Sequence, residues 1–146
     1  MMQELMASTT EPLDTATRTY YLAMFYEALR ALELDESPSI EDWRLCSDAL
    51  NMVDMIIDLG IASDDGGVLD NAKQAMLGAM ERYRTHGVIR RDGAGIQALR
   101  AMLEDFADMV NVLPARVMIH THRKTQARLR DIIDGKYTKK DKVVTL

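Results

Sequence analysis

Residues 93–113 read GAGIQALRAMLEDFADMVNVL, and apolar side chains recur in this stretch at alternating intervals of three and four residues. The recurring positions are Ile96, Leu99, Leu103, Phe106, Val110 and Leu113. In an α-helix this spacing puts all of them on one side, in the a/d arrangement of helices that pack along their length. The stretch therefore predicts a long amphipathic helix whose apolar seam lies in a helical core or at a dimer interface.

The rest of the chain predicts four more helices around this one. Three of them are expected at residues 13–34, 68–86 and 114–134. The other lies between the first two of these, with an N-terminal cap at Ser37 or Ser39 and a C-terminal stop at Gly60. Strand-like alternation is nearly absent. We therefore expect an all-α, single-domain bundle of about five helices over residues 1–135, followed by a basic C-terminal tail over residues 136–146.

The overall composition is that of a soluble, globular protein. The chain has 146 residues, of which 47% are hydrophobic and 28% are charged, so it fits one domain with a substantial core. No run approaches the roughly 20 consecutive apolar residues that a membrane span needs. The N-terminal stretch has no basic residue before Arg18, unlike a signal peptide, and the single Cys46 cannot form an internal disulfide. These features favour a cytoplasmic protein without a membrane partner.

Charge is distributed unevenly along the chain. Residues 1–72 contain 15 acidic and 3 basic side chains, whereas residues 115–146 contain 3 acidic and 9 basic ones. The net charge of −5 therefore hides an acidic first half and a basic C-terminal region. Such asymmetry favours binding to another macromolecule, or the pairing of opposite ends between two copies of the chain.

Three groups of residues contain side chains of the kinds that catalytic or ligand-binding sites use. In none of them does the spacing along the chain fit such a site. His120 and His122 are two residues apart, which puts their rings on different sides of a helix, whereas metal-binding pairs need three or four. Asp54 and Asp58 would stand side by side on a helix face that is expected to be solvated. The glycines after RRD at 90–92 fit a tight helix entry rather than a phosphate loop. We therefore expect no enzyme activity, no cofactor, no metal and no small-molecule substrate.

The strongest candidate for a binding surface is a basic stripe on the helix predicted at 114–134. Its members are Arg116, Arg123, Lys124, Arg128 and Arg130. Residues 116, 123 and 130 are seven apart and form nearly one line on a helix, with the other two beside it. The stripe can neutralise the phosphates of a nucleic acid, it can dock on an acidic protein surface, or it can be an ordinary solvated helix face. An acidic chain and few base-reading side chains on the stripe favour the protein partner.

The segment at residues 13–34 is apolar on almost every side in its middle, which reads YYLAMFYEALRAL. A helix of this kind is central in a bundle or is pressed against a second chain. Tyr21 and Phe25 are therefore assigned to one seam, in the core or between two subunits, together with Leu99, Leu103, Phe106 and Val110. With the charge asymmetry, this pattern predicts a homodimer.

Three stretches give the chain a family resemblance. They are WRLCSDALNM, IRRDGAGIQALRAMLEDFADMV and LPARVMIHTHRKTQARLRDII, within residues 43–134. In pattern they resemble small helical proteins of bacteriophages and bacterial mobile elements, and the resemblance carries over no catalytic residue. It implies a small accessory protein that regulates or inhibits by binding. The sequence therefore predicts a non-enzymatic protein–protein interaction protein that acts as a homodimer. The alternative is a nucleic-acid-binding regulator that uses the basic helix at 114–134 and the C-terminal tail.

Overall fold

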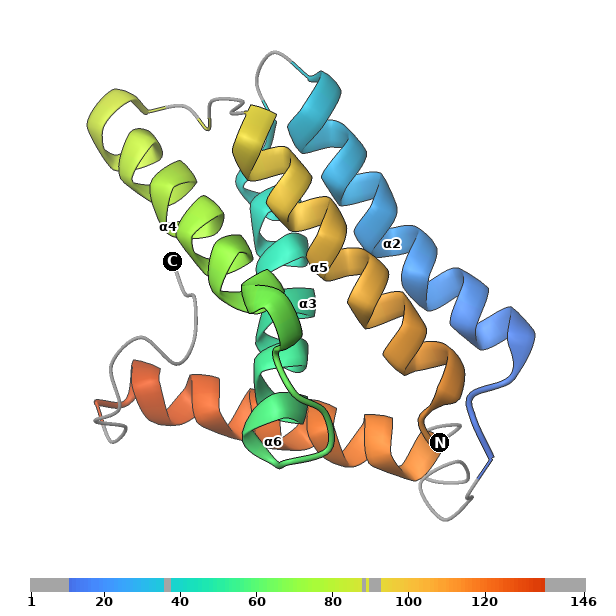
Figure 1. The fold of residues 1–146 in the computed structure, drawn as a ribbon. Coiled ribbons are helices and arrows are strands. Elements are labelled where there is room, and N and C mark those ends of the chain that lie inside the picture. The colour runs from blue at the N-terminus through green and yellow to red at the C-terminus, as the bar shows by residue number, and fades with distance from the viewer. Residues whose placement is uncertain (1–10, 36–37, 88, 90–92, 136–146) are drawn as a thin grey trace.

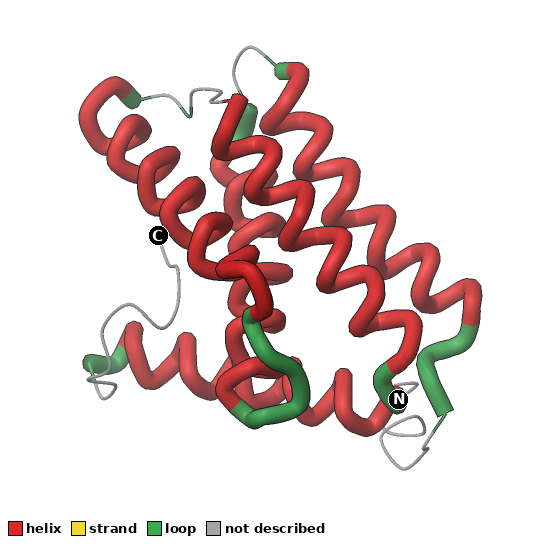
Figure 2. Tube along the Cα trace, in the orientation of Figure 1, coloured by secondary structure: helices red, strands yellow, loops and turns green. Residues whose placement is uncertain are grey.

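The computed structural model describes residues 11–35, 38–87, 89 and 93–135, and the chain is helical in these residues (Figure 1). The elements are α2 (Thr15–Leu34), α3 (Ile40–Asp58), the short 3₁₀ turn η1 (Asp65–Gly67), α4 (Val68–His86), α5 (Gly93–Val112) and α6 (Ala115–Ile133). Figure 2 shows no strand in the described part of the chain. The predicted all-α bundle of about five helices is confirmed, and the predicted tail lies outside the described residues.

Four helices form the body of the bundle, and the fifth lies across its end. α3 contacts α2, α4, α5 and α6, and α5 contacts α2, α3 and α4, so these two helices form the centre of the bundle. α6 lies across one end of the body and packs mainly on α3 (Figure 1). One side of α6 therefore faces the bundle, and the opposite side faces outward. None of the helices in the described residues is both long and apolar enough to cross a lipid bilayer.

Side-chain caps begin the first two helices. Asp14 caps α2 by accepting hydrogen bonds from the backbone N–H and the hydroxyl of Thr17, at 2.8 and 2.9 Å. Ser39 caps α3 in a reciprocal capping box, in which its hydroxyl oxygen accepts from the N–H of Asp42 and the Asp42 carboxylate accepts from the N–H of Ser39. One of the two predicted caps of this helix is therefore confirmed.

Glycines end α3 and α4, and Gly60 is the stop that the sequence predicts. Gly60 has a left-handed backbone (φ 76°), and the N–H of Ile61 donates back to the carbonyl of Ile56 at 3.1 Å. Gly87 is also left-handed (φ 74°), and its N–H donates to the carbonyl of Tyr83 at 2.7 Å. A side chain with a β-carbon is strained in this conformation, which is why glycine stands at these two helix ends.

The seam of α5 lies in the core of a single chain rather than on its surface. Four of its side chains, with exposed fractions of 4% or less, are Leu99, Leu103, Phe106 and Val110. Phe25 of α2 is 3% exposed, and its ring meets that of Phe106 edge to face at 5.4 Å between centroids. The half-buried Tyr21 completes the cluster, 5.2 Å from Phe25. Each of these buried apolar side chains stabilises the fold by roughly 1.5–3 kcal/mol.

Backbone hydrogen bonding connects the start of α6 to the segment that leads into α2. The sequence predicts a helix from residue 114, and in the structure Pro114 stands at the N-cap of α6, one position before its first helical residue. The backbone N–H of Ala115 donates to the carbonyl of Glu11 at 2.7 Å, and Pro12 and Pro114 form an isolated antiparallel bridge. The first turn of α6 is thereby held at the bundle through its backbone.

Candidate functional site

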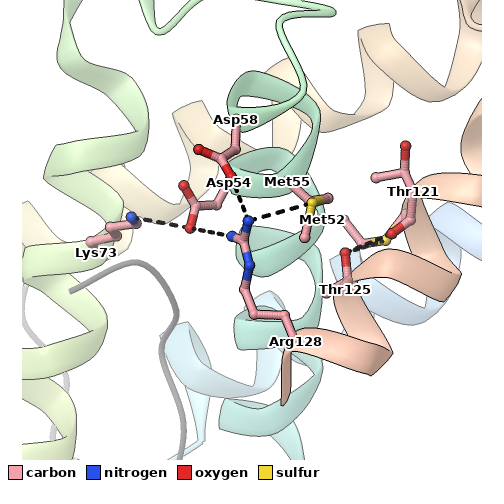
Figure 3. Close-up of polar contacts among 8 residues, drawn as sticks. All are labelled: Met52, Asp54, Met55, Asp58, Lys73, Thr121, Thr125 and Arg128. Atoms are coloured by element: carbon pink, nitrogen blue, oxygen red, sulfur yellow. Dashed lines mark hydrogen bonds and ion pairs between the residues drawn. The ribbon is translucent and has the colours of Figure 1, made fainter. Parts of the chain in front are cut away.

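The inward side of α6 carries a charged network that joins three helices (Figure 3). Arg128 of α6 reaches α3, where its Nη2 lies 2.5 Å from Asp58 Oδ2 and its Nη1 lies 3.6 Å from Asp54 Oδ2. Lys73 of α4 lies 3.3 Å from the same oxygen of Asp54. The side chains of Arg128 and Asp54 are 8% and 6% exposed, and that of Asp58 is 27% exposed. Two cations and two carboxylates therefore balance each other at the α3–α6 contact.

Hydroxyl and sulfur atoms fill the space beside this network. The hydroxyl of Thr125 donates to the carbonyl of Thr121 at 2.8 Å and lies 3.6 Å from the sulfur of Met52. Arg128 Nη2 lies 3.5 Å from the sulfur of Met55 (Figure 3). Thr121 and Thr125 are both buried. Beyond its first turns, α6 therefore binds α3 through polar and sulfur-containing side chains more than through large aliphatic ones.

This network corrects two predictions from the sequence. Asp54 was expected on a solvated face, and this is wrong, because Lys73 and Arg128 cover its carboxylate. Arg128 was expected on the exposed basic stripe, and this is wrong as well, because its side chain turns inward with those of Thr121 and Thr125. The spacing of four and then three residues between these positions of α6 is the signal that marks one helix side.

The outward side of α6 carries the rest of the predicted stripe. Its four exposed members, called the basic face below, are Arg116, Arg123, Lys124 and Arg130. His120 is also exposed, whereas His122 is half-buried, so the two imidazoles do not converge. Over the residues that the structure describes, no group of three or more His, Cys, Asp or Glu side chains could hold a metal ion. The structure thus separates Arg128 from the stripe and leaves the basic face toward solvent.

His120 is also separated from the carboxylates with which it could share acid–base chemistry. Asp54 is buried beneath α6 and engaged by two cations, while His120 points to solvent. A shallow groove between α4 and α5 is lined by small residues and amides, among them Asn71, Gln74 and Gln97, and none of the predicted site residues lines it. The arginines at 90 and 91 that precede α5 lie outside the described residues.

The core raises the pKa values of two of its titratable groups, Cys46 and Tyr21. Cys46 is fully buried, as expected of a small hydrophobic side chain, and burial with the nearby Asp42 and Asp48 raises the pKa of its thiol to about 12. Burial, with a smaller effect of Asp48, also raises the pKa of the Tyr21 hydroxyl to about 12. Both groups stay protonated near neutral pH and are suited to packing rather than to proton transfer.

Comparison with known proteins adds no further constraint on this site. No protein-family model, curated protein or solved structure matches the chain.

Proposed function

We propose that this protein is a non-enzymatic binding protein that docks on an acidic surface of another protein through the outward side of α6. The observation that carries the proposal is the basic face, on which Arg116, Arg123 and Arg130 stand seven residues apart and are all exposed. Seven residues are about two helical turns, so the three guanidinium groups are spread along roughly 20 Å of one helix. Lys124 adds a fourth charge beside this line.

The chemistry of arginine suits a protein partner with clustered carboxylates. A guanidinium presents its N–H donors in a planar fork that matches a carboxylate, and it is desolvated more easily than an ammonium. The inward side of α6 is tied to α3 by Arg128, which supports a rigid presentation of the outward side. A surface of this kind contributes mostly to the rate and specificity of association.

The same proposal assigns the carboxylates of α3 a structural role instead of a catalytic one. Asp54 and Asp58 are the paired carboxylates that could have served acid–base chemistry, and both are engaged by Arg128. With the resemblance to small helical proteins of phages and mobile elements, this supports an accessory regulator or inhibitor that acts by binding.

A nucleic acid is the second candidate partner, because Gln126 is exposed on α6 beside the basic face and could contact base edges. Two observations weigh against it. Asp131 and Asp134 are exposed at the C-terminal end of the same helix, and the whole chain has a net charge of −5. Both features repel a polyanion, so the protein partner is preferred.

The test is affinity capture from host lysate, performed with and without nuclease, with the full chain and two charge-reversed variants. One variant carries Arg116→Glu, Arg123→Glu and Arg130→Glu on the basic face. The matched control carries Arg44→Glu and Arg84→Glu, at exposed arginines on α3 and α4. We expect one protein to be retained by the wild type and the control and lost by the basic-face variant.

Two results would count against a protein partner. Retention of the same protein by the basic-face variant would show that α6 is not the docking surface. Loss of all retained material on nuclease treatment, together with a shift of labelled duplex DNA or RNA that weakens steeply with salt, would favour the nucleic-acid alternative.

A further inference from the structure

The outward side of α2 carries apolar side chains that its own chain leaves uncovered. Of the nine large hydrophobic residues that are exposed in the described chain, four lie on this helix. They are Tyr20, Met24, Tyr26 and Leu34, with exposed fractions of 79, 38, 37 and 56%. The opposite side of α2 is already packed in the core through Phe25 and Leu29. α2 is therefore apolar on two sides, and only one of these sides is buried by other helices of the same chain.

The outward side of α2 has the spacing of a helix-packing seam. Tyr20, Ala23, Glu27, Arg30 and Leu34 recur at intervals of three and four residues, and all five are exposed. Two opposite charges stand near the middle of this seam. Neither Glu27 nor Arg30 forms an ion pair with another described residue. The seam thus offers apolar area together with one acid and one base that have no ion-pair partner in the described chain.

We propose that this side of α2 is the interface at which two copies of the chain pair, with their α2 helices antiparallel about a two-fold axis. A two-fold axis brings the same patch of both copies together, so each contact occurs twice. The register that sets Glu27 opposite Arg30 of the second copy also sets Ala23 opposite Leu34, because both pairs have the same midpoint along the helix. Both ion pairs and both apolar contacts therefore form in a single register.

The side chains around Ala23 fit this register. In helix packing, a knob on one helix enters a hole formed by four residues of the other. Leu34 of one copy enters the hole that Tyr20, Ala23, Met24 and Glu27 form on the other. The small Ala23 leaves room at the bottom of this hole, and the exposed Tyr20 and Met24 form its walls. The contact covers the three exposed apolar residues Tyr20, Met24 and Leu34 in each copy.

The seam fits a second copy better than an unrelated partner, because its residues complement each other under the two-fold operation. Because Glu27 and Arg30 lie symmetrically about the two-fold axis, Glu27 of each copy pairs with Arg30 of the other, and two ion pairs form. The overlap of residues 23–34 spans about 18 Å of helix, which is short for a stable interface. The proposed dimer is therefore a reversible one, whose population depends on protein concentration.

The test is the molar mass of the full chain in solution, measured by sedimentation equilibrium from a few micromolar to several hundred micromolar. Glu27→Arg and Arg30→Glu each bring like charges together across the axis, and we expect each to weaken dimerisation by about tenfold or more. The double variant with both changes restores opposite charges, and its dissociation constant should return to within about threefold of the wild type. Leu34→Asp removes the knob and should leave a monomer.

The control is Leu77→Asp on α4, where an exposed leucine lies away from α2, and it should dimerise like the wild type. Circular dichroism of each variant verifies that the bundle is folded. A wild type that stays monomeric at several hundred micromolar would overturn the proposal. A double variant that does not recover dimerisation would overturn the register and with it the charge argument. Variants of the basic face on α6 leave this equilibrium unchanged, so the two proposals fail separately.

Discussion

The guanidinium of Arg128 holds α6 on α3 through charge rather than through apolar packing. It lies 2.5 Å from Asp58 and 3.6 Å from Asp54, and its side chain is 8% exposed. Moving charges out of water is costly, and this cost is offset only while all partners of the network are present. The effect of losing one partner is therefore much larger than the net contribution of the intact network.

Arg128→Met should destabilise the protein strongly. The substitution keeps most of the apolar stem but removes one of the two cations that lie against the buried carboxylate of Asp54. We expect the free energy of unfolding to fall by about 3–5 kcal/mol in urea titrations. Arg123→Met on the outward side of the same helix is the matched control, with an expected change within about 0.5 kcal/mol. Equal effects of the two substitutions would contradict the assignment of Arg128 to the interior.

Cys46 should resist thiol reagents while the chain is folded. Its side chain is fully buried, and burial raises the pKa of the thiol from its ordinary value of 9.0 to about 12, so little thiolate forms at pH 8. We expect the native protein to react with a chromogenic disulfide reagent at least about a hundredfold more slowly than the urea-unfolded protein, because reaction requires opening of the core. Reaction at the rate of an exposed thiol would show that this part of α3 is accessible.

At the scale of single elements, α5 contributes to stability through one apolar side that packs on three other helices. Its seam packs against α2, α3 and α4, and Leu103 and Phe106 are at most 1% exposed. Leu103→Ala should cost about 2–5 kcal/mol and Phe106→Ala about 3–5 kcal/mol, because each leaves a cavity in addition to the lost burial. Glu104→Ala, between them on the exposed side, should change stability little. Thermal or urea unfolding of the three variants measures this difference, and similar curves would contradict the core assignment.

The comparison of α5 with α6 shows which structural features a single sequence can predict. The positions of α5 that face inward are large and apolar, so periodicity alone separates core from surface. On α6, the side that packs on α3 includes Thr121, Thr125 and Arg128, and an interpretation that takes charge as a mark of exposure assigns Arg128 to the wrong side. Helix ends follow from local caps and glycines. The rotation of α6 about its axis depends on Asp54 and Asp58, which are distant in the sequence.

α2 illustrates a pattern that fits two environments. The sequence predicts that its apolar middle lies in the core or at a subunit interface. The structure buries one side of the helix in the core and leaves the other side exposed, and the exposed side is the one that we propose as the subunit interface. Phe25 and Leu29 face the core, whereas Tyr20 and Leu34 face outward. Periodicity could not separate these sides, because both are apolar and the difference depends on which neighbouring helices cover them.

At the scale of the whole molecule, basic, acidic and apolar side chains gather on different surfaces. The basic face lies on the outward side of α6. The exposed side of α5 is acidic near its C-terminal end, where burial and the nearby Asp108, Asp64 and Glu104 raise the pKa of Asp105. The proposed dimer seam on α2 lies on a third surface, so partner binding and self-association do not compete for the same residues.

The free energy of unfolding should fall in alkaline solution, because the pKa values of two core residues differ between the folded and the unfolded chain. In the unfolded chain the thiol of Cys46 ionises near 9.0 and the hydroxyl of Tyr21 near 10.0, whereas the core raises both pKa values to about 12. Between these limits the folded state binds more protons than the unfolded state. The stabilisation is therefore fully present below pH 9 and is lost as the pH rises toward 12.

Urea unfolding at intervals from pH 8 to pH 12 measures this loss, and the double variant Tyr21→Phe, Cys46→Ala should show a clearly shallower decline than the wild type. The variant has a lower stability at pH 8, because Cys46→Ala leaves a small cavity, but its slope against pH is the quantity that decides the question. Tyr20→Phe is the matched control, since it removes the hydroxyl of a ring that is 79% exposed, and its slope should equal that of the wild type. If the double variant declined as steeply as the wild type, the alkaline loss would arise from other groups, because these two would then titrate alike in both states.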